Sequence, residues 1–203
     1  MSPQQKATLR EEIVSCAMRF FAAKGIRSVK MDDIARELTM SKRTLYELFE
    51  NKEAVLYEGV RRHHEESTRR MNELVSQSDN VMTVILASYR VKIDELRQVN
   101  PNFYADLGRY PAVMDYLEQR NRESRQRFMD FLHRGVDEGY FRPEVNYDLI
   151  AHLFTAIGHY MADHNLYSQY SLEDLFHNML FTTLRGFCTQ RGLEVLDREL
   201  YSV

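Results

Sequence analysis

The sequence contains few of the residues that interrupt helices or cross-link chains. Its 203 residues include four prolines, eight glycines and two cysteines. The alternation of apolar and polar residues that is typical of strands is nearly absent, so we expect an all-α chain. Cys16 and Cys188 are far apart and form no CxxC pair, which argues against a disulfide framework and against a cysteine-based zinc site.

Long hydrophobic runs are also missing. No stretch approaches the length needed to cross a bilayer. Glu11 and Glu12 stand where a signal peptide would need an apolar segment. Hydrophobic residues nevertheless make up 44% of the chain, which is enough for a sizeable core. These features predict a soluble, cytoplasmic protein.

The motifs of common enzyme classes do not occur. There is no G-x-S-x-G, no Walker sequence and no dinucleotide-binding fingerprint. His152, His159, Asp163 and His164 lie close in sequence, but isolated histidines on amphipathic helices are more often surface or packing residues than metal ligands. We therefore expect no catalytic residues, no metal site and no cofactor, and a protein that is not an enzyme.

The charge of the chain is unevenly distributed. Residues 19–52 carry eight basic and five acidic side chains, whereas residues 61–203 carry 17 basic and 21 acidic ones. A basic N-terminal segment is thus joined to an acidic remainder, although the whole chain has a net charge of −3. This asymmetry favours contact between the N-terminal segment and a polyanion.

Apolar residues at three- and four-residue spacing predict about nine helices, separated by glycine, proline or polar turns. Gly25 is expected to end the first helix in a left-handed conformation, and Ser41 to cap the third with its hydroxyl. We expect the helices over residues 9–24, 31–38, 41–50, 53–78, 81–99, 101–110, 112–138, 147–165 and 172–189.

The second and third helices carry the pattern of a helix-turn-helix. Ala35 is small where two helices must cross closely, and Leu38, Leu45 and Phe49 are placed to fill the wedge between them. The third helix is then left with a polar, partly basic outer side. A helix of this diameter fits the major groove of DNA, and its N-terminal residues reach the base edges.

This arrangement predicts the residues that contact DNA. Lysine and arginine suit guanine edges or phosphates, hydroxyl groups bind phosphate or base, and a tyrosine ring can pack on sugar. The lysines that flank the motif are expected to contact the backbone. The predicted set is Lys30, Ser41, Lys42, Arg43, Thr44, Tyr46 and Lys52. The alternative is an ordinary three-helix subdomain with a solvated basic face.

The same residues resemble the TetR/AcrR family of regulators. The resemblance covers residues 9–56 and rests on Gly25, Ile34-Ala35, Ser41-Lys42-Arg43-Thr44-Leu45-Tyr46, Phe49, Lys52-Glu53 and Leu56. Two positions depart from the family pattern. Thr39 stands where glycine is common, so a different turn backbone is expected, and Leu48 stands where an aromatic residue is common.

The resemblance implies two domains, a helix-turn-helix domain over residues 1–52 and a helical effector-binding and dimerisation domain over residues 53–203. It also implies a homodimer held by the last two predicted helices and a small-molecule effector. Independently, helix 147–165 has both a large-apolar side and a small-residue side, which is typical of a helix buried on two sides. The alternative is that this helix is simply central within one subunit.

Aromatic residues on the predicted helices of the second domain suggest that the effector is apolar or aromatic. Each of them is equally well explained as plain core. The residues expected to line the pocket are Tyr89, Phe103, Tyr104, Phe128, Phe131 and Phe154.

The sequence thus predicts a ligand-responsive transcriptional regulator. We expect a repressor that binds a near-palindromic operator as a homodimer and is released by its effector. The rival interpretation is a helical ligand-binding or scaffold protein whose DNA-reading module is inactive.

Overall fold

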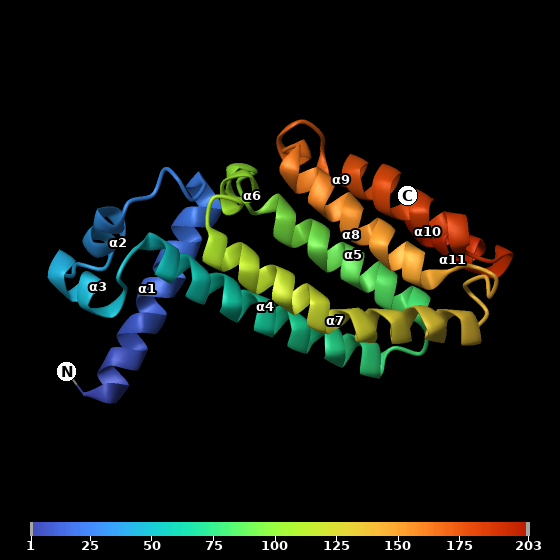
Figure 1. Ribbon diagram of the computed structural model, residues 1–203, viewed down its shortest axis with the longest axis horizontal. Helices are drawn as coiled ribbons and strands as arrows, with labels where there is room; N and C mark the ends of the chain where they lie inside the picture. Colours follow the sequence, from blue (N-terminus) through green and yellow to red (C-terminus); the bar gives the residue numbers. More distant parts are fainter. Residues whose placement is uncertain (1, 202–203) are drawn as a thin grey trace. The chain divides into compact units, whose positions relative to one another are not determined.

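The computed structural model describes residues 2–201, apart from the side chains of Leu172 and of residues 199–201, and this part of the chain is helical (Figure 1). The only pairing of extended backbone that it contains is an isolated bridge between Phe141 and Cys188. No described helix is both long and apolar enough to span a membrane. The α-helices are α1 (Pro3–Lys24), α2 (Met31–Glu37), α3 (Lys42–Leu48), α4 (Lys52–Gln77), α5 (Val81–Arg97), α6 (Asn102–Leu107), α7 (Pro111–Asp137), α8 (Tyr147–Asp163), α9 (Leu172–Leu175), α10 (Thr182–Phe187) and α11 (Gln190–Tyr201).

The predicted all-α fold is confirmed, and most predicted helices have their counterpart, with two differences at the ends of the chain. Helix α1 begins at Pro3 rather than near residue 9, because Ser2 and Gln5 form a capping box that extends it. The hydroxyl of Ser2 accepts a hydrogen bond from the backbone N–H of Gln5, whose side chain in turn accepts from Ser2.

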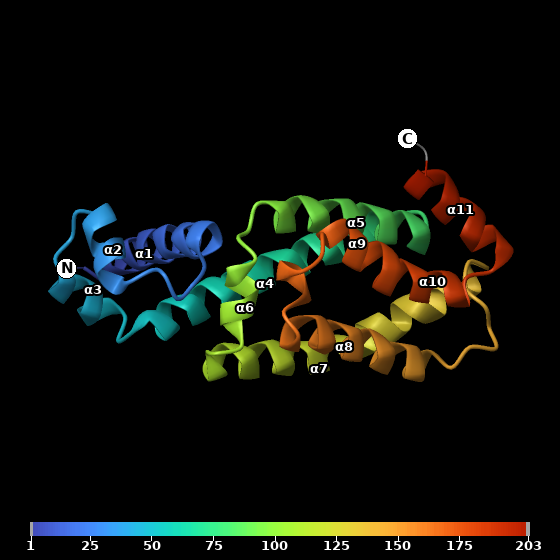
Figure 2. The same ribbon diagram turned by 90° about the horizontal axis from the view of Figure 1, so that it is seen from above.

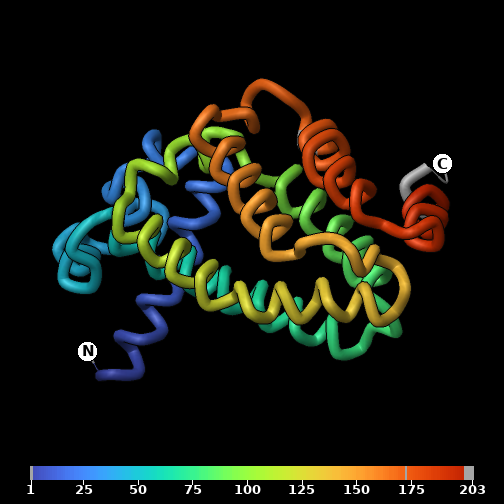
Figure 3. The backbone as a smooth tube through the Cα atoms, turned by 45° about the vertical axis from the view of Figure 1, so that its right-hand side comes forward, coloured from blue at the N-terminus to red at the C-terminus, as the bar shows by residue number. Residues whose placement is uncertain are grey.

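The predicted helix over 172–189 is not uniform, and a further helix follows it. Between α9 and α10 the residues Phe176–Phe181 form π-helical turns. After α10 the backbone becomes extended at Cys188, and the chain changes direction into α11 (Figure 3). The hydroxyl of Thr189 accepts a hydrogen bond from the backbone N–H of Gly192 and so caps the first turn of α11.

The chain divides into two compact units. The first unit consists of Met1–Thr68 and Gln98–Glu118, and the second of Arg69–Arg97 and Gln119–Val203. The boundaries fall within the continuous helices α4 and α7 and at the end of α5. Helix α6 therefore belongs to the same unit as the helix-turn-helix, although it lies far from it in sequence.

The core of the first unit is built by α1, α2, α3, the start of α4 and the segment around α6. Ile13, Phe21, Ile34, Leu45 and Leu56 are completely buried in it. Gly25 follows α1 at φ 79° and ψ 154°. Its φ is positive as expected, but ψ is extended rather than left-handed helical, in a region that is essentially restricted to glycine.

The second unit is built by the end of α4, α5, most of α7, and α8 to α11, which Figure 2 shows in a second orientation. Its core combines aliphatic residues with a cluster of aromatic side chains. The ring of Phe187 packs edge-to-face on the rings of Phe141, Tyr147 and Phe154, at centroid distances of 5.1, 5.8 and 6.3 Å.

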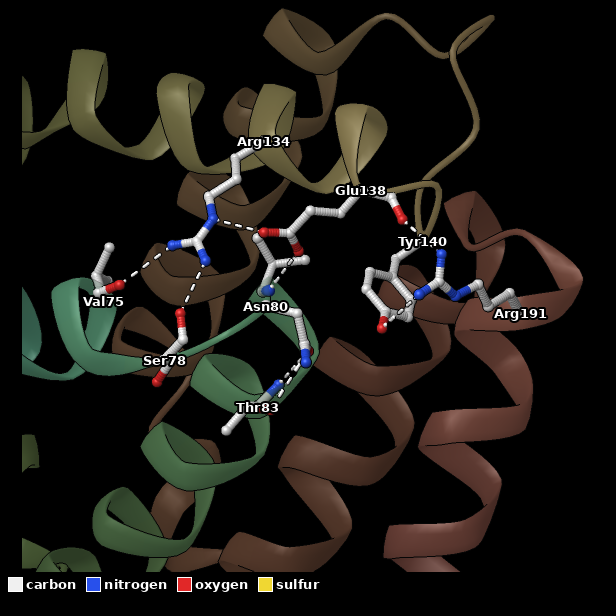
Figure 4. A network of polar contacts seen from close by, with 9 residues as sticks. Val75, Ser78, Asn80, Thr83, Arg134, Glu138, Tyr140 and Arg191 are labelled. Atoms are coloured by element: carbon white, nitrogen blue, oxygen red, sulfur yellow. Dashed lines mark hydrogen bonds and ion pairs between the residues drawn. The ribbon is translucent and has the colours of Figure 1, made fainter.

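A polar network ties the α4–α5 turn to α7 and α11 within this unit (Figure 4). Arg134 donates to the backbone carbonyls of Val75 and Ser78 at 3.1 and 2.9 Å and to the carboxylate of Glu138 at 2.6 Å. Arg191 of α11 donates to the carbonyl of Glu138 at 2.9 Å and stacks over the ring of Tyr140.

Candidate nucleic-acid interface

The wedge between α2 and α3 forms as the sequence pattern predicts. Ile34, Ala35, Leu45 and Phe49 are buried, and Leu38 is half-buried beside them. Because these apolar residues occupy the inner side of both helices, the opposite side of α3 faces solvent.

The turn between the two helices has the backbone that glycine would give it. Thr39 lies at φ 51°, and its neighbour Met40 donates a hydrogen bond from its N–H to the carbonyl of Ala35 at 2.9 Å. A β-branched residue is strained in this left-handed region, because its Cβ substituents crowd the backbone. The chain therefore keeps the turn and tolerates the strain of threonine at a position where glycine is common in the family.

Helix α3 presents most of the predicted DNA-contacting residues on one exposed side. The hydroxyl of Ser41 caps the helix by accepting the N–H of Thr44 at 3.1 Å, and lies 2.9 Å from the hydroxyl of Thr44. Lys42 and Arg43 are exposed, and half of the surface of Tyr46 is open to solvent. These five residues are brought together on a single turn and a half of helix.

The two cations of this helix lie in ion pairs with exposed acids. Lys42 binds Asp32 of α2 at 2.5 Å, and Arg43 binds Glu47 at 2.9 Å. Exposed ion pairs of this kind contribute little to stability. Lys42 and Arg43 can therefore leave their carboxylate partners for a DNA phosphate or base edge at little cost in free energy.

The two flanking lysines differ in their surroundings. Lys30 is an exposed residue at the start of α2, and its backbone N–H donates to the carboxylate of Asp33 at 2.9 Å. The ammonium group of Lys52 instead donates to the backbone carbonyls of Ile26 and Val29, both at 2.9 Å. Burial lowers the pKa of Lys52, and the negative charge of Asp106 opposes this shift.

Two arginines of α1 support the motif, although the sequence pattern places them on the solvent side of that helix. Arg10 stacks over the ring of Phe49 at 4.1 Å and donates to the carbonyl of Leu48 at 2.5 Å. Arg19 binds Glu37 at the end of α2 at 2.7 Å. Amphipathic spacing could not reveal these roles, since both depend on where α2 and α3 pack on α1.

The residues expected to line an effector pocket are divided between the two units. Phe103 and Tyr104 pack into the core of the first unit, with the helix-turn-helix. Tyr89, Phe128, Phe131 and Phe154 are half-buried against the core of the second unit. Within the second unit Phe128 meets Phe154 edge-to-face at 6.0 Å, and Tyr89 meets Phe181 at 4.8 Å.

Helix α8 leaves an apolar stripe open to solvent. Leu149, Leu153 and Tyr160 lie at helical spacing and are 63%, 44% and 52% exposed. Ala151 and Met161, on the other side of the helix, are buried within the unit. The helix thus has one apolar side inside the unit and a second apolar side outside it.

The histidines of α8 lie on its exposed surface. His152 is 3.1 Å from the guanidinium of Arg125 and 3.8 Å from the carboxylate of Asp148. Among the side chains that the structure describes, no three His, Cys, Asp or Glu are grouped closely enough to hold a metal ion.

Comparison with known proteins gives concordant results. The family described as bacterial regulatory proteins, tetR family, matches residues 13–58. The HTH-type transcriptional repressor KstR2 of Mycolicibacterium smegmatis is 26% identical over 154 residues, which are 73% of this chain and 75% of that protein. KstR2 of Mycobacterium tuberculosis strain H37Rv is 27% identical over 146 residues, or 70% of this chain and 73% of the relative.

Solved structures share the fold. The ketosteroid transcriptional regulator KstR2 of Mycobacterium tuberculosis superposes with a TM-score of 0.60 at 23% identity, over 89% of this chain and 95% of that one. A TetR-family transcriptional regulator from Agrobacterium tumefaciens gives a TM-score of 0.66 at 16% identity, covering 93% and 100%. With the wedge, the turn and the exposed third helix in place, residues 13–58 form a helix-turn-helix that matches the TetR family of bacterial regulatory proteins, and the chain shares the fold of solved TetR-family regulators.

Proposed function

We propose that this protein is a transcriptional repressor that binds operator DNA through α3 and is released by a small-molecule effector. The observation that carries the proposal is the exposed side of α3, where Ser41, Lys42, Arg43, Thr44 and Tyr46 stand together on a buried apolar wedge. Lys30, at the start of α2, adds a further exposed cation to the motif. A repressor that binds operator DNA is located in the cytoplasm, so we propose that location for this protein.

We propose two functional domains, with DNA binding in residues 1–52 and effector binding and dimerisation in residues 53–203. The exposed stripe of α8 supports a homodimer, because Leu149, Leu153 and Tyr160 need an apolar partner. A second copy of α8, together with the α9–α10 run, would supply it as a four-helix bundle. The operator should then be a near-palindrome, since two-fold symmetry places two reading helices in successive major grooves.

An apolar or aromatic effector suits the second unit. Tyr89, Phe128, Phe131 and Phe154 are all only half-buried there, so a flat apolar ligand could contact several rings. The relative KstR2 is described as a ketosteroid regulator, which makes ketosteroids a rational first group of compounds. A thermal-shift screen should include them beside polar compounds of similar size. No stabilisation by any apolar compound would remove this part of the proposal.

The central test is binding of the purified protein to the DNA upstream of its own coding region at two salt concentrations. We expect a discrete complex that survives competitor DNA and weakens with salt. If no complex forms there, selection from random DNA separates a distant operator from an inactive reading module. Failure of both experiments would favour the rival interpretation, a helical ligand-binding or scaffold protein.

A further inference from the structure

Lys52 is one of the residues that the sequence predicts to contact the DNA backbone, but its surroundings point to a different task. Two donors of its ammonium group are already used by the carbonyls of Ile26 and Val29. Both of these residues are buried, with side chains that are 0% and 1% exposed. The lysine is therefore directed into the α1–α2 loop of its own unit.

The same loop is also held by the segment around α6. Asp106 is only 8% exposed, and its carboxylate accepts a hydrogen bond from the backbone N–H of Arg27 at 2.8 Å. Asn100 donates its backbone N–H to the carbonyl of Ala22 at 2.7 Å. Gly25 allows this approach, because a Cβ there would lie 2.9 Å from the Cβ of Asn102.

We propose that Lys52 and Asp106 form a clamp on the α1–α2 loop that positions the helix-turn-helix for specific DNA binding, so that Lys52 is a positioning residue rather than a phosphate contact. The loop leads directly into Met31, the first and buried residue of α2. Since α2 and α3 share one apolar wedge, a shift of the loop changes the direction in which α3 meets the groove. The inference rests on the proposed DNA-binding function.

The salt dependence of DNA binding separates a phosphate contact from a positioning role for Lys52. A lysine that neutralises a phosphate contributes about 0.9 to the slope of log K against log salt concentration, and it does so on any DNA sequence. A positioning residue leaves this slope unchanged and affects specific binding more than non-specific binding. Removing the charge of Asp106 should strengthen DNA binding if charge alone matters, because an acid then disappears from the DNA-binding unit. The clamp predicts that it weakens specific binding instead.

The experiment compares Lys52→Met, Asp106→Asn, their double variant and the matched control Lys30→Met, which removes an exposed lysine near the same loop. Each protein is titrated over a salt series with a fluorescent duplex that the wild type selects from random DNA, and with an unrelated duplex of equal length. We expect Lys52→Met and Asp106→Asn each to weaken specific binding about tenfold, as loss of a charged hydrogen bond does. The double variant should be little weaker than either single one, because both act on one loop.

Lys30→Met should instead lose about 0.9 of slope on both duplexes. The clamp is overturned if Lys52→Met loses the same slope on both duplexes, or if Asp106→Asn binds as tightly as the wild type or more tightly. A general loss of folded protein would lower the active fraction on both duplexes equally, which stoichiometric titration detects. If Lys52→Met does not fold, Asp106→Asn alone decides.

Amide exchange of the free protein provides an arm that is independent of DNA. The N–H of Arg27 should exchange faster in Lys52→Met than in Lys30→Met, because the loop that presents it has lost one side of its clamp. If the wild type selects no DNA, the proposed function fails while this comparison still tests the clamp. Equal exchange rates of the Arg27 N–H in Lys52→Met and Lys30→Met would overturn the clamp.

Discussion

The carboxylate of Glu138 caps α5 from a distance of 57 residues in sequence, accepting a hydrogen bond from the backbone N–H of Val81 at 2.7 Å. Val81 is completely buried, so its N–H depends on this acceptor in the folded protein. Replacing Glu138 with alanine also removes the acidic partner of Arg134, which keeps only its bonds to the carbonyls of Val75 and Ser78. We expect a loss of about 1–3 kcal/mol in the free energy of unfolding, the range for an unsatisfied buried donor.

Urea unfolding measures this loss, and Glu144→Ala is the matched control. Glu144 is an exposed glutamate whose contact with Arg142 is long, at 3.8 Å. Its replacement should change stability by less than about 0.5 kcal/mol. Equal effects of the two substitutions would show that the cap on α5 does not stabilise the second unit.

Thr39 offers a stabilising substitution at the turn of the reading motif. Its φ of 51° is unfavourable for a β-branched residue and acceptable for asparagine. We expect Thr39→Asn to raise the free energy of unfolding by about 1 kcal/mol, through relief of left-handed strain. Thr39→Val keeps the branched Cβ and should bring no gain. If thermal unfolding shows the same stability for both variants, the backbone at residue 39 is not strained.

The outlines of the helices could be predicted from the sequence because burial imposes a period of 3.6 residues. The wedge residue Leu45 and the cap Ser41 are local features, and the structure places both as the pattern indicates. The prediction placed the start of α1 too late, although Ser2 and Gln5 form a local capping motif that indicates it. Helix α11 was missed, although Thr189 gives a local cap signal and its residues follow a clear amphipathic pattern.

Features that depend on tertiary contacts could not be predicted. Whether the ammonium group of Lys52 meets a phosphate or a backbone carbonyl depends on the path of the α1–α2 loop, which sequence spacing does not describe. The same holds for Phe103, an apolar residue on a helix of the second sequence domain that packs in the first structural unit. Apolar pattern shows that a side chain is buried, but not which core receives it.

Two residues of α3 should affect DNA binding differently. Arg43 can bind a guanine edge in a bidentate manner, so Arg43→Ala should lose roughly 1–3 kcal/mol of discrimination between bases at one position. Tyr46→Ala should weaken binding to all sequences, because its ring is expected to contact sugar and phosphate. Titration of the operator and of duplexes with single substituted base pairs measures both effects. Unchanged affinity and specificity in both variants would exclude this face of α3 as the reading surface.

Glu47→Gln tests whether the ion pair between Arg43 and Glu47 opposes DNA binding. It removes the carboxylate that holds Arg43 at 2.9 Å and leaves the helix otherwise intact. The freed guanidinium and the lost negative charge should both favour the complex, so we expect tighter binding. Weaker binding would mean that the ion pair positions Arg43 for its contact with DNA.

The exposed stripe of α8 predicts the effect of a charge on assembly. Leu149→Glu and Leu153→Glu should convert the proposed dimer to a monomer, because a carboxylate buried in an apolar interface is strongly unfavourable. Val91→Glu is the control, since Val91 is a 52% exposed aliphatic residue of α5, outside the proposed interface. Sedimentation equilibrium decides between the states. Dissociation by Val91→Glu with intact dimers in both α8 variants would place the interface elsewhere.

A buried thiol and a buried tyrosine hydroxyl predict how the stability of the second unit depends on pH. Burial raises the pKa of the Cys188 thiol to about 11 and that of the Tyr147 hydroxyl to about 12. In the unfolded chain both groups lose their protons at lower pH. The stability that they contribute is therefore complete below about pH 9 and is lost as the pH rises through 11 and 12.

Urea unfolding between pH 8 and 11 should show this decline, and Cys188→Ala should make it shallower by removing one titrating group. The same burial predicts a thiol that stays unreactive at pH 8. With Cys16→Ala as the background, a chromogenic disulfide reagent should label Cys188 only as the second unit opens, at a rate that increases with urea. Rapid labelling of the folded protein would contradict both predictions, because it requires an accessible thiolate and burial of Cys188 disfavours that form.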